Sequence, residues 1–427
     1  MEFLVKADPE LWQRIGVDVT RLSKMREILS QMYKNMFLNQ EIRPEGMKYF
    51  DEIVSNIHTG RIKEIVEAKE EGRVVVGAFC VYIPEEIVVA LDGICIGLCG
   101  GSQATVPDAE RILPRSICPL VKSAYGFRIS RVCPYFQVAD FVAGETTCDS
   151  KKKTWEVLNR DIETYVMEIP PMKRETEREL LFKEVVRFKE ELEKRSGIKL
   201  DEERLLKGVR IINRKRKALQ RLNSLRQHDV LPISGKDVLL IEQIAYYDDP
   251  ERFATKVEEL CDELEDRIAK GIGYGEKKPL RVMISGTPMA FPNFKLHNIV
   301  ERLGAIIVNE ESCIGTRYFK DLVEEKNNLT DQLYAIVDRS MKVHCAIFTP
   351  NEERIERILE EYKNSKADGL IYYSLTFCQT YLIEAVKVKQ TCEREGIPFL
   401  MVESDYSPED VGQLQTRVEA FLETLRG

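Results

Sequence analysis

Short apolar runs and amphipathic stretches alternate along most of the chain. From residue 1 to about residue 70, apolar residues recur at helical spacing, which predicts a helical N-terminal segment. The runs Arg73–Phe79 and Ile87–Leu91 are short and rich in β-branched residues, which predicts two buried strands. Strand-like and helical stretches then alternate to about residue 170. This alternation is typical of an α/β lobe over residues 71–170.

The stretch 171–275 is predicted to be a helical connector. Two long charged helices are predicted over residues 173–196 and 201–228, joined at Gly197, and a third covers roughly residues 250–270. These helices carry charges on most faces, so we expect them to lie partly on the outside of the molecule. They separate the first α/β lobe from a second one.

The second lobe, residues 276–427, has the clearest pattern. Strands are predicted at Leu280–Ser285, Ala305–Val308, Gly369–Ser374 and Pro398–Val402, and helices near 292–303, 380–394 and 411–425. Strands that alternate with crossover helices form a parallel, doubly wound sheet, with ligands at the carboxyl ends of the strands. The fold class predicted is therefore α/β, with two flavodoxin-like lobes, a helical N-terminal segment and a helical connector.

Composition narrows the function classes. The 427 residues carry a net charge of −8, which does not favour nucleic acid as a partner. The one basic run, Arg214–Lys217, lies in a helix of mixed charge, and we interpret it as a solvated helix face. No stretch approaches the roughly 18 apolar residues of a membrane helix, and the N-terminus lacks a signal-peptide pattern. We therefore expect a cytoplasmic protein that does not enter membranes.

Eleven cysteines are the most unusual feature of the composition. In a reducing cytosol they are not expected to form a disulfide framework, so they are packing thiols, catalytic thiols or metal ligands. Six of them lie in loops, some marked by Gly or Pro and some directly after a predicted strand. These six candidate ligands are Cys99, Cys118, Cys148, Cys313, Cys345 and Cys378.

The other five cysteines divide into two groups. Cys80 ends a hydrophobic strand, and Cys261 and Cys392 lie within helices, so we interpret all three as buried packing thiols. Cys95 precedes Cys99 by four residues and Cys133 is followed by proline, so either one could replace one of the six ligands.

The chemistry of these candidates favours iron–sulfur binding. There is no CxxC motif, and only four histidines accompany the eleven cysteines, so dispersed thiolates point to a cluster more than to zinc or non-haem iron. The chain contains no GxxxxGK[ST] phosphate loop. The segment Ser285–Pro288 (SGTP) is interpreted as an ordinary turn.

Several motifs together resemble the superfamily of 2-hydroxyacyl-CoA dehydratases and benzoyl-CoA reductases. The resemblance extends from about residue 70 to the end of the chain, and the order and spacing of the motifs carry it. They are Cys118 with Lys122, Cys148 with Asp149, the segment Met283–Met289, and Cys378 followed by Gly396–Tyr406.

This resemblance implies a ligand set. In the dehydratases three cysteines hold one four-iron cluster, a role that Cys118, Cys148 and Cys378 would fill here. The additional Cys99, Cys313 and Cys345 make the chain similar to the double-cubane branch of the superfamily. Proteins of that branch bind two four-iron cubanes joined by a bridging sulfide, an [8Fe–9S] cluster.

The resemblance also implies a reaction and partners. A separate ATP-hydrolysing iron–sulfur reductase would supply low-potential electrons, the chain would be a homodimer, and it would reduce small molecules such as acetylene, azide or hydrazine. Lys122, Glu311 and His344 are candidate proton donors on their nearness in sequence to cysteines. Two alternatives remain: a dehydratase or acyl-CoA reductase component with a single [4Fe–4S] cluster, and an electron-transfer module without catalysis.

Overall fold

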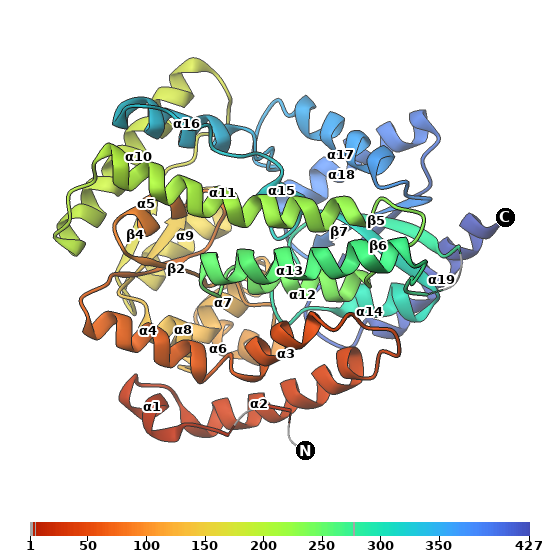
Figure 1. The fold of residues 1–427 in the computed structure, drawn as a ribbon, viewed down its shortest axis with the longest axis horizontal. Coiled ribbons are helices and arrows are strands. Elements are labelled where there is room, and N and C mark those ends of the chain that lie inside the picture. Colours follow the sequence, from red (N-terminus) through yellow and green to blue (C-terminus); the bar gives the residue numbers. More distant parts are fainter. Residues whose placement is uncertain (1–2, 5, 276–277) are drawn as a thin grey trace.

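Two four-stranded parallel sheets form the centres of two lobes in the computed structural model, which describes residues 3–4, 6–275 and 278–427 (Figure 1). The sheet orders are β2-β1-β3-β4 and β6-β5-β7-β8, which is the same order within each lobe. The strands are β1 (Val75–Ala78), β2 (Ile94–Gly97), β3 (Phe141–Glu145), β4 (Thr164–Met167), β5 (Leu280–Gly286), β6 (Ala305–Glu311), β7 (Gly369–Leu375) and β8 (Phe399–Ser404). The predicted fold class is confirmed.

Helices alternate with the strands of both lobes and also precede and connect the lobes. The first 70 residues contain α1 (Pro9–Arg14), α2 (Val19–Tyr33), a π-helical turn (Lys34–Leu38), α3 (Met47–Ser55) and α4 (Gly60–Glu70). The first lobe contains α5 (Glu85–Ala90), a 3₁₀ turn (Gln103–Thr105), α6 (Val106–Ala109), α7 (Pro119–Ile129), α8 (Pro134–Val138) and α9 (Asp149–Leu158).

The connector contains α10 (Glu175–Ser196), α11 (Glu202–Leu225), α12 (Gly235–Ile244) and α13 (Pro250–Ala269). The second lobe adds α14 (Lys295–Arg302), α15 (Thr316–Phe319), α16 (Leu329–Met341), α17 (Glu352–Asn364), α18 (Gln379–Glu395) and α19 (Val411–Arg426). The lobe boundary that we expected between residues 275 and 276 adjoins residues 276–277, which lie outside the described residues.

Local sequence explains the long connector helices. Gly197 ends α10 in the left-handed conformation, with φ of 71°, which glycine adopts without steric cost. The Asp201 side chain then caps α11 by accepting a hydrogen bond of 2.8 Å from the Arg204 amide. Figure 1 shows α11 and α13 side by side across the front of the molecule.

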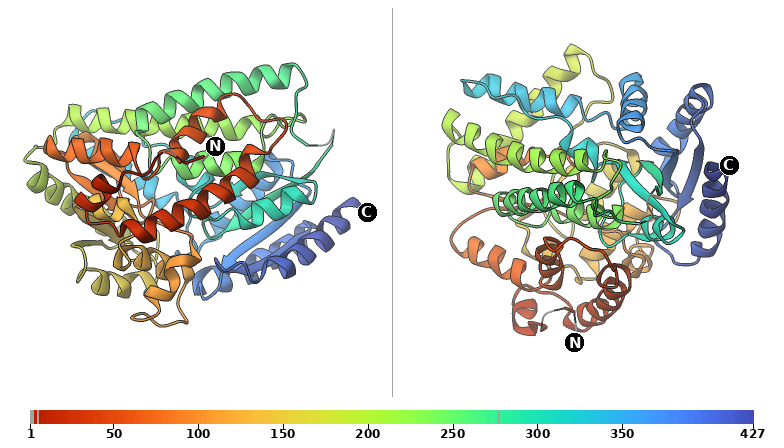
Figure 2. Two further views of the ribbon diagram at one scale, coloured as in Figure 1. Left: turned by 90° about the horizontal axis from the view of Figure 1, so that it is seen from below. Right: turned by 45° about the vertical axis from the view of Figure 1, so that its right-hand side comes forward.

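Both lobes share one buried core. Val76 of β1 and Leu370 of β7 belong to the same cluster of buried side chains. The N-terminal helices form an outer layer, in which Leu22 and Leu29 of α2 pack into the core of the first lobe (Figure 2). Among the described residues, no helix has the length and apolar character needed to cross a bilayer.

One predicted strand is wrong. Most of the run Ile87–Leu91 lies in helix α5, which ends at Ala90, and the second strand of this lobe is Ile94–Gly97. Glu85 and Glu86 occupy the first turn of α5, where the helix dipole favours carboxylates. A short apolar run does not by itself distinguish a buried strand from a buried helix.

The interpretation of Arg214–Lys217 as a solvated face is wrong for two of its four residues. Arg214 is exposed and forms an ion pair of 2.6 Å with Glu258 on α13. Lys215 and Arg216, by contrast, are buried. At this run α11 packs against both α13 and α5. Some of its side chains therefore face solvent and others face the neighbouring helices.

The two buried cations of α11 are neutralised by the first turn of α5. Arg216 pairs with Glu86 at 2.6 Å, and Lys215 pairs with Glu85 at 2.6 Å. Ions that are removed from water are stable only when they are paired in this way. The pairs therefore fix the connector to the first lobe.

Removing one partner of the buried pair should destabilise the protein strongly. We expect Glu86→Ala to lower the free energy of unfolding by about 3 kcal/mol, because the buried Arg216 would lose its closest partner and keep only the longer contact of 3.4 Å with Glu85. Glu258→Ala, which breaks the exposed pair with Arg214, should cost less than about 1 kcal/mol. Urea denaturation of the two variants measures the difference, and equal losses would contradict the assignment.

Candidate cluster site

A cavity of about 790 Å³ lies where the carboxyl ends of the two sheets face each other. Parallel sheets present ligands at this edge because the loops that follow the strands meet there. Six cysteines line the cavity, three from each lobe. They are Cys80, Cys118, Cys148, Cys313, Cys345 and Cys378.

Strand ends bring four of these thiols to the cavity. Cys80 follows β1 by two residues and Cys313 follows β6 by two; Cys148 follows β3 by three residues and Cys378 follows β7 by three. Because β3 and β7 hold the same place in their sheets, Cys148 and Cys378 are topologically equivalent. The repeated topology therefore brings thiols from both lobes to one site.

Three of the six thiols belong to helix N-caps. Cys118 precedes α7, Cys148 precedes α9 and Cys378 precedes α18. The first N–H groups of a helix have no partner inside the helix, and together with the helix dipole they stabilise negative charge. These positions favour thiolates, and they would favour an anionic cluster bound to them.

Cys118, Cys148 and Cys378 form a first triad. The Cys378 thiol donates a hydrogen bond to the Cys118 sulfur, which lowers the pKa of Cys118 and raises that of Cys378. The backbone N–H groups of Leu120 and Val121 lower the pKa of Cys118 further. Burial raises the pKa of Cys148, and the negative charge of a Cys378 thiolate raises it further.

Cys80, Cys313 and Cys345 form a second triad. Burial raises the pKa of Cys80 most, and the nearby thiols of Cys313 and Cys345 add to this effect. Burial also raises the pKa of Cys313, which the guanidinium of Arg317, 3.5 Å from its sulfur, partly offsets. The Tyr381 hydroxyl lies 3.7 Å from the Cys345 sulfur.

A buried ammonium group faces both triads. Lys151, in the first turn of α9, lines the cavity and forms an ion pair with the fully buried Glu145 at the end of β3. Burial raises the pKa values of Cys80 and Cys148, and the positive charge of Lys151 offsets part of this rise. Lys151 therefore offsets part of the negative charge that thiolates would place in this cavity.

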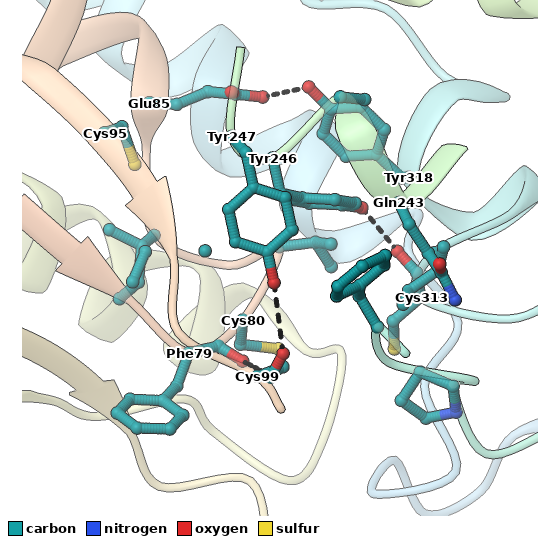
Figure 3. A pocket seen from close by; sticks show the side chains of 18 of the residues that line it. Phe79, Cys80, Glu85, Cys95, Cys99, Gln243, Tyr246, Tyr247, Cys313 and Tyr318 are labelled. Atoms are coloured by element: carbon teal, nitrogen blue, oxygen red, sulfur yellow. Dashed lines mark hydrogen bonds between the residues drawn. The ribbon is translucent and has the colours of Figure 1, made fainter. Parts of the chain in front are cut away.

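The thiol of Cys99, a predicted ligand, has different surroundings. Cys99 lines two smaller neighbouring cavities, and its thiol donates a hydrogen bond of 3.0 Å to the Phe79 carbonyl (Figure 3). Burial raises its pKa to about 12. Cys95 and Cys133 also line smaller cavities, and Cys261 and Cys392 are buried in helices.

The three candidate proton donors have structural partners. The Lys122 ammonium is 2.8 Å from the Glu110 carboxylate. Glu311 lies in a buried network in which Arg317 and Arg354 each approach its carboxylate to 2.7 Å. The His344 ring contacts the Lys173 ammonium, and burial followed by this charge lowers its pKa to about 3. These three side chains lie outside the set that lines the large cavity.

Sequence reasoning missed Cys80, Lys151, Arg317 and Tyr381. For Cys80 a signal existed, because it follows a predicted strand as Cys313 and Cys378 do. The hydrophobic pattern extends that strand to Phe79, however, so Cys80 falls at the end of the strand itself. Lys151, Arg317 and Tyr381 give no signal along the chain, because only tertiary packing brings them to the thiols.

The site fits an iron–sulfur cluster better than a single ion. Among the described residues, no three His, Cys, Asp or Glu side chains are close enough to hold one metal ion. In a cluster each iron takes one thiolate, so ligands lie apart around a larger cavity. All eleven cysteines are free thiols, and six of them surround this space.

Comparison with known proteins shows the family of the chain. Residues 80–425 match the family model "2-hydroxyglutaryl-CoA dehydratase, D-component". The chain is 32% identical over 379 residues to the "Putative dehydratase subunit YjiM" of Escherichia coli, covering 88% of this chain and 97% of that protein. It is 25% identical to the "(R)-phenyllactyl-CoA dehydratase beta subunit" of Clostridium sporogenes, covering 88% and 99% of the two chains.

A more distant relative is a benzoyl-CoA reductase subunit of Thauera aromatica, 23% identical over 81% of this chain and 88% of that protein. The two-lobed α/β fold with its cysteine-lined cavity and these matches, which cover most of the chain, lead to one conclusion: the chain belongs to the 2-hydroxyglutaryl-CoA dehydratase D-component family, within the superfamily of 2-hydroxyacyl-CoA dehydratases and benzoyl-CoA reductases.

Proposed function

We propose that this protein is an iron–sulfur reductase that holds a double-cubane [8Fe–9S] cluster and reduces small molecules. The observation that carries the proposal is the pair of cysteine triads in one cavity. A cubane held by three thiolates keeps one iron free, and two such irons can share a bridging sulfide. Two triads in one cavity supply the ligands for this arrangement.

Cys80 replaces Cys99 in the proposed ligand set. Cys118, Cys148 and Cys378 would hold one cubane, and Cys80, Cys313 and Cys345 would hold the other. Cys99 is turned toward the Phe79 carbonyl and lines the neighbouring cavities. When bound, the cluster would supply electrons at low potential.

The chain's own residues would tune and protect this site. The N-termini of α7, α9 and α18 direct N–H groups toward the first triad, and Lys151 adds a positive charge. The Arg317 guanidinium, held by its ion pair with Glu311, adds a positive charge beside the Cys313 sulfur. Such surroundings stabilise added negative charge and so control the reduction potential.

Electrons would come from a separate ATP-hydrolysing iron–sulfur reductase, and the chain would act as a homodimer. The absence of a phosphate-loop motif from the sequence is consistent with ATP being hydrolysed elsewhere. The related proteins named above are themselves subunits of a dehydratase and a reductase, which supports a role within a larger assembly.

A second candidate function is a dehydratase or acyl-CoA reductase component with one [4Fe–4S] cluster. The names of two related proteins favour this candidate. These proteins are subunits of a phenyllactyl-CoA dehydratase and of a benzoyl-CoA reductase, and both names contain a CoA ester as the substrate. Such a component would use Cys118, Cys148 and Cys378 and leave the second triad without iron. The two candidates therefore differ in iron content.

Iron analysis separates the candidates. Anaerobically purified protein should contain about eight irons per chain, and a variant with Cys80, Cys313 and Cys345 all changed to Ser should lose about half or more, because one cubane loses its ligands. The matched control changes Cys95, Cys99 and Cys133 to Ser and should keep its iron. About four irons in the wild type, with no loss in the first variant, would identify a protein with a single cluster.

Turnover distinguishes a reductase from an electron-transfer module. With an ATP-driven reductase as electron donor, the wild-type protein should reduce acetylene, and the variant lacking the second triad should lose at least about 90% of this activity. Conversion of a 2-hydroxyacyl-CoA instead would support the dehydratase function. A cluster that is reduced while none of the offered substrates is consumed would support the electron-transfer module.

The Lys151 charge should set the potential of the cluster. We expect Lys151→Met to lower the midpoint potential by on the order of 100 mV, because a cation near the thiolates stabilises the reduced, more negative state. Lys153→Met is the control, since Lys153 lies outside the set that lines the cavity, is exposed and pairs with the exposed Glu156 at 2.6 Å. Redox titration monitored by EPR measures both, and equal shifts would argue against a specific role of Lys151.

A further inference from the structure

A small inner cavity adjoins the large one, and a small outer cavity adjoins the inner one. The inner cavity, of about 90 Å³, shares Cys80 and Cys313 with the large cavity. The outer cavity, of about 130 Å³, reaches the N-terminal helical layer, where Ile28 of α2 is 61% exposed. The three cavities therefore form a series from the surface near α2 to the proposed cluster.

The two small cavities meet at a narrow junction. Gly97, Cys99, Tyr247 and Phe291 line both of them. The Tyr247 hydroxyl donates a hydrogen bond of 3.4 Å to the Cys99 carbonyl, and Figure 3 shows this bond at the edge of the inner cavity. Tyr247 and Cys99, joined by this bond, thus form part of the partition between the two cavities.

The walls of this series are mostly apolar. The outer cavity is lined by side chains such as Met25, Leu29 and Phe127, and the inner one by side chains such as Ile83, Leu120 and Ile314. An apolar wall offers an ion nothing to replace its hydration shell, so it excludes charged molecules and admits uncharged ones. The inner volume has room for only a few heavy atoms, far fewer than an acyl-CoA contains.

The charged groups along the series are already neutralised. In the inner cavity Glu85 pairs with Lys215 at 2.6 Å, and Lys151 pairs with Glu145. In the outer cavity burial lowers the pKa of His58 to about 3, so this ring is neutral at physiological pH. The walls of the two small cavities therefore carry no net charge, which favours the passage of an uncharged molecule.

One polar atom in the inner cavity lacks a partner. Gln243 is 1% exposed and lines this cavity, and its amide nitrogen donates a hydrogen bond of 2.6 Å to the Met289 carbonyl. Because a carbonyl accepts that bond, the atom facing Met289 must be the nitrogen, and the amide oxygen is left without a partner. A buried unpaired acceptor is costly, and a ligand with a polarised hydrogen would satisfy it.

We propose that the inner cavity is the binding chamber for a small uncharged substrate, which arrives through the outer cavity, and that the Gln243 oxygen orients it by accepting a hydrogen bond. This inference rests on the proposed reductase function for its chemistry. The location of the chamber, beside Cys80 and Cys313, places a bound molecule next to the second triad.

Xenon tests the chamber without any turnover. Crystals of the holoprotein under xenon should show a xenon atom in the inner cavity, because apolar cavities of this kind bind it. Gly97→Ala should weaken this peak, since its new Cβ would lie 2.8 Å from the Cβ of Tyr246, which lines the inner cavity. Gly412→Ala, whose Cβ meets nothing within 4 Å, is the matched control. No xenon in the inner cavity of the wild type overturns the proposal.

Kinetics test the route with acetylene as the probe. Gly97→Ala should lower kcat/KM for acetylene by about tenfold at unchanged iron content, because one added methyl group narrows the junction. Gln243→Leu should raise KM while the iron content stays as in the wild type. If Gly97→Ala does not fold, Tyr247→Phe tests the same junction, because loss of the hydroxyl bond should admit xenon faster.

The outcomes separate this inference from the proposed function. Eight irons and acetylene reduction, combined with an unchanged kcat/KM in Gly97→Ala, would overturn the route and leave the reductase assignment standing. Xenon in the inner cavity of a protein with four irons and no acetylene reduction would refute the reductase function and keep the chamber as an apolar binding site.

Discussion

The structure depends on stabilising negative charge in a buried cavity. Six thiols converge between two lobes, and thiolates or a cluster bound to them would be costly in a low-dielectric interior without compensation. The compensation comes from three helix N-termini at the first triad, from Arg317 at the second, and from Lys151, which faces both. Backbone dipoles thus act at the first triad only, while side-chain cations act at both.

The repeated topology explains how one chain gathers six ligands. Each lobe has the strand order 2-1-3-4, so corresponding loops open at the same edge of each sheet. When the two edges face each other, loops far apart in sequence meet, as Cys148 and Cys378 do. The buried pairs between α11 and α5 hold the connector in place and so fix the first lobe beneath it. The site is therefore a consequence of lobe packing and does not depend on any local motif.

Much of the fold followed from hydrophobic pattern alone. The strands of the second lobe, the long connector helices and the glycine that ends α10 were predictable because each has a strong local signal. The helix at Ile87–Leu91 was not, since a short apolar run fits either element, and the burial of Lys215 and Arg216 depends on partners 130 residues away.

The site shows the same limit. Position in loops identified five of the six thiols that line the large cavity. Cys80 and Cys99 each follow a strand by two residues, and tertiary packing decides which of the two side chains points into that cavity. Cys99 follows β2 as Cys313 follows β6, yet its thiol turns back to the Phe79 carbonyl. Equivalent positions in two similar lobes therefore do not guarantee equivalent roles.

The choice between Cys80 and Cys99 also determines how a substrate can approach. If Cys80 is a ligand, both triads occupy the large cavity and an iron–sulfur cluster fills the space between them, so little of that cavity remains for a substrate. Cys99 is then free to form part of the partition with Tyr247 beside the cluster. With the proposed ligand set, a substrate would therefore approach through the apolar cavities behind the second triad, and their size would restrict it to small molecules.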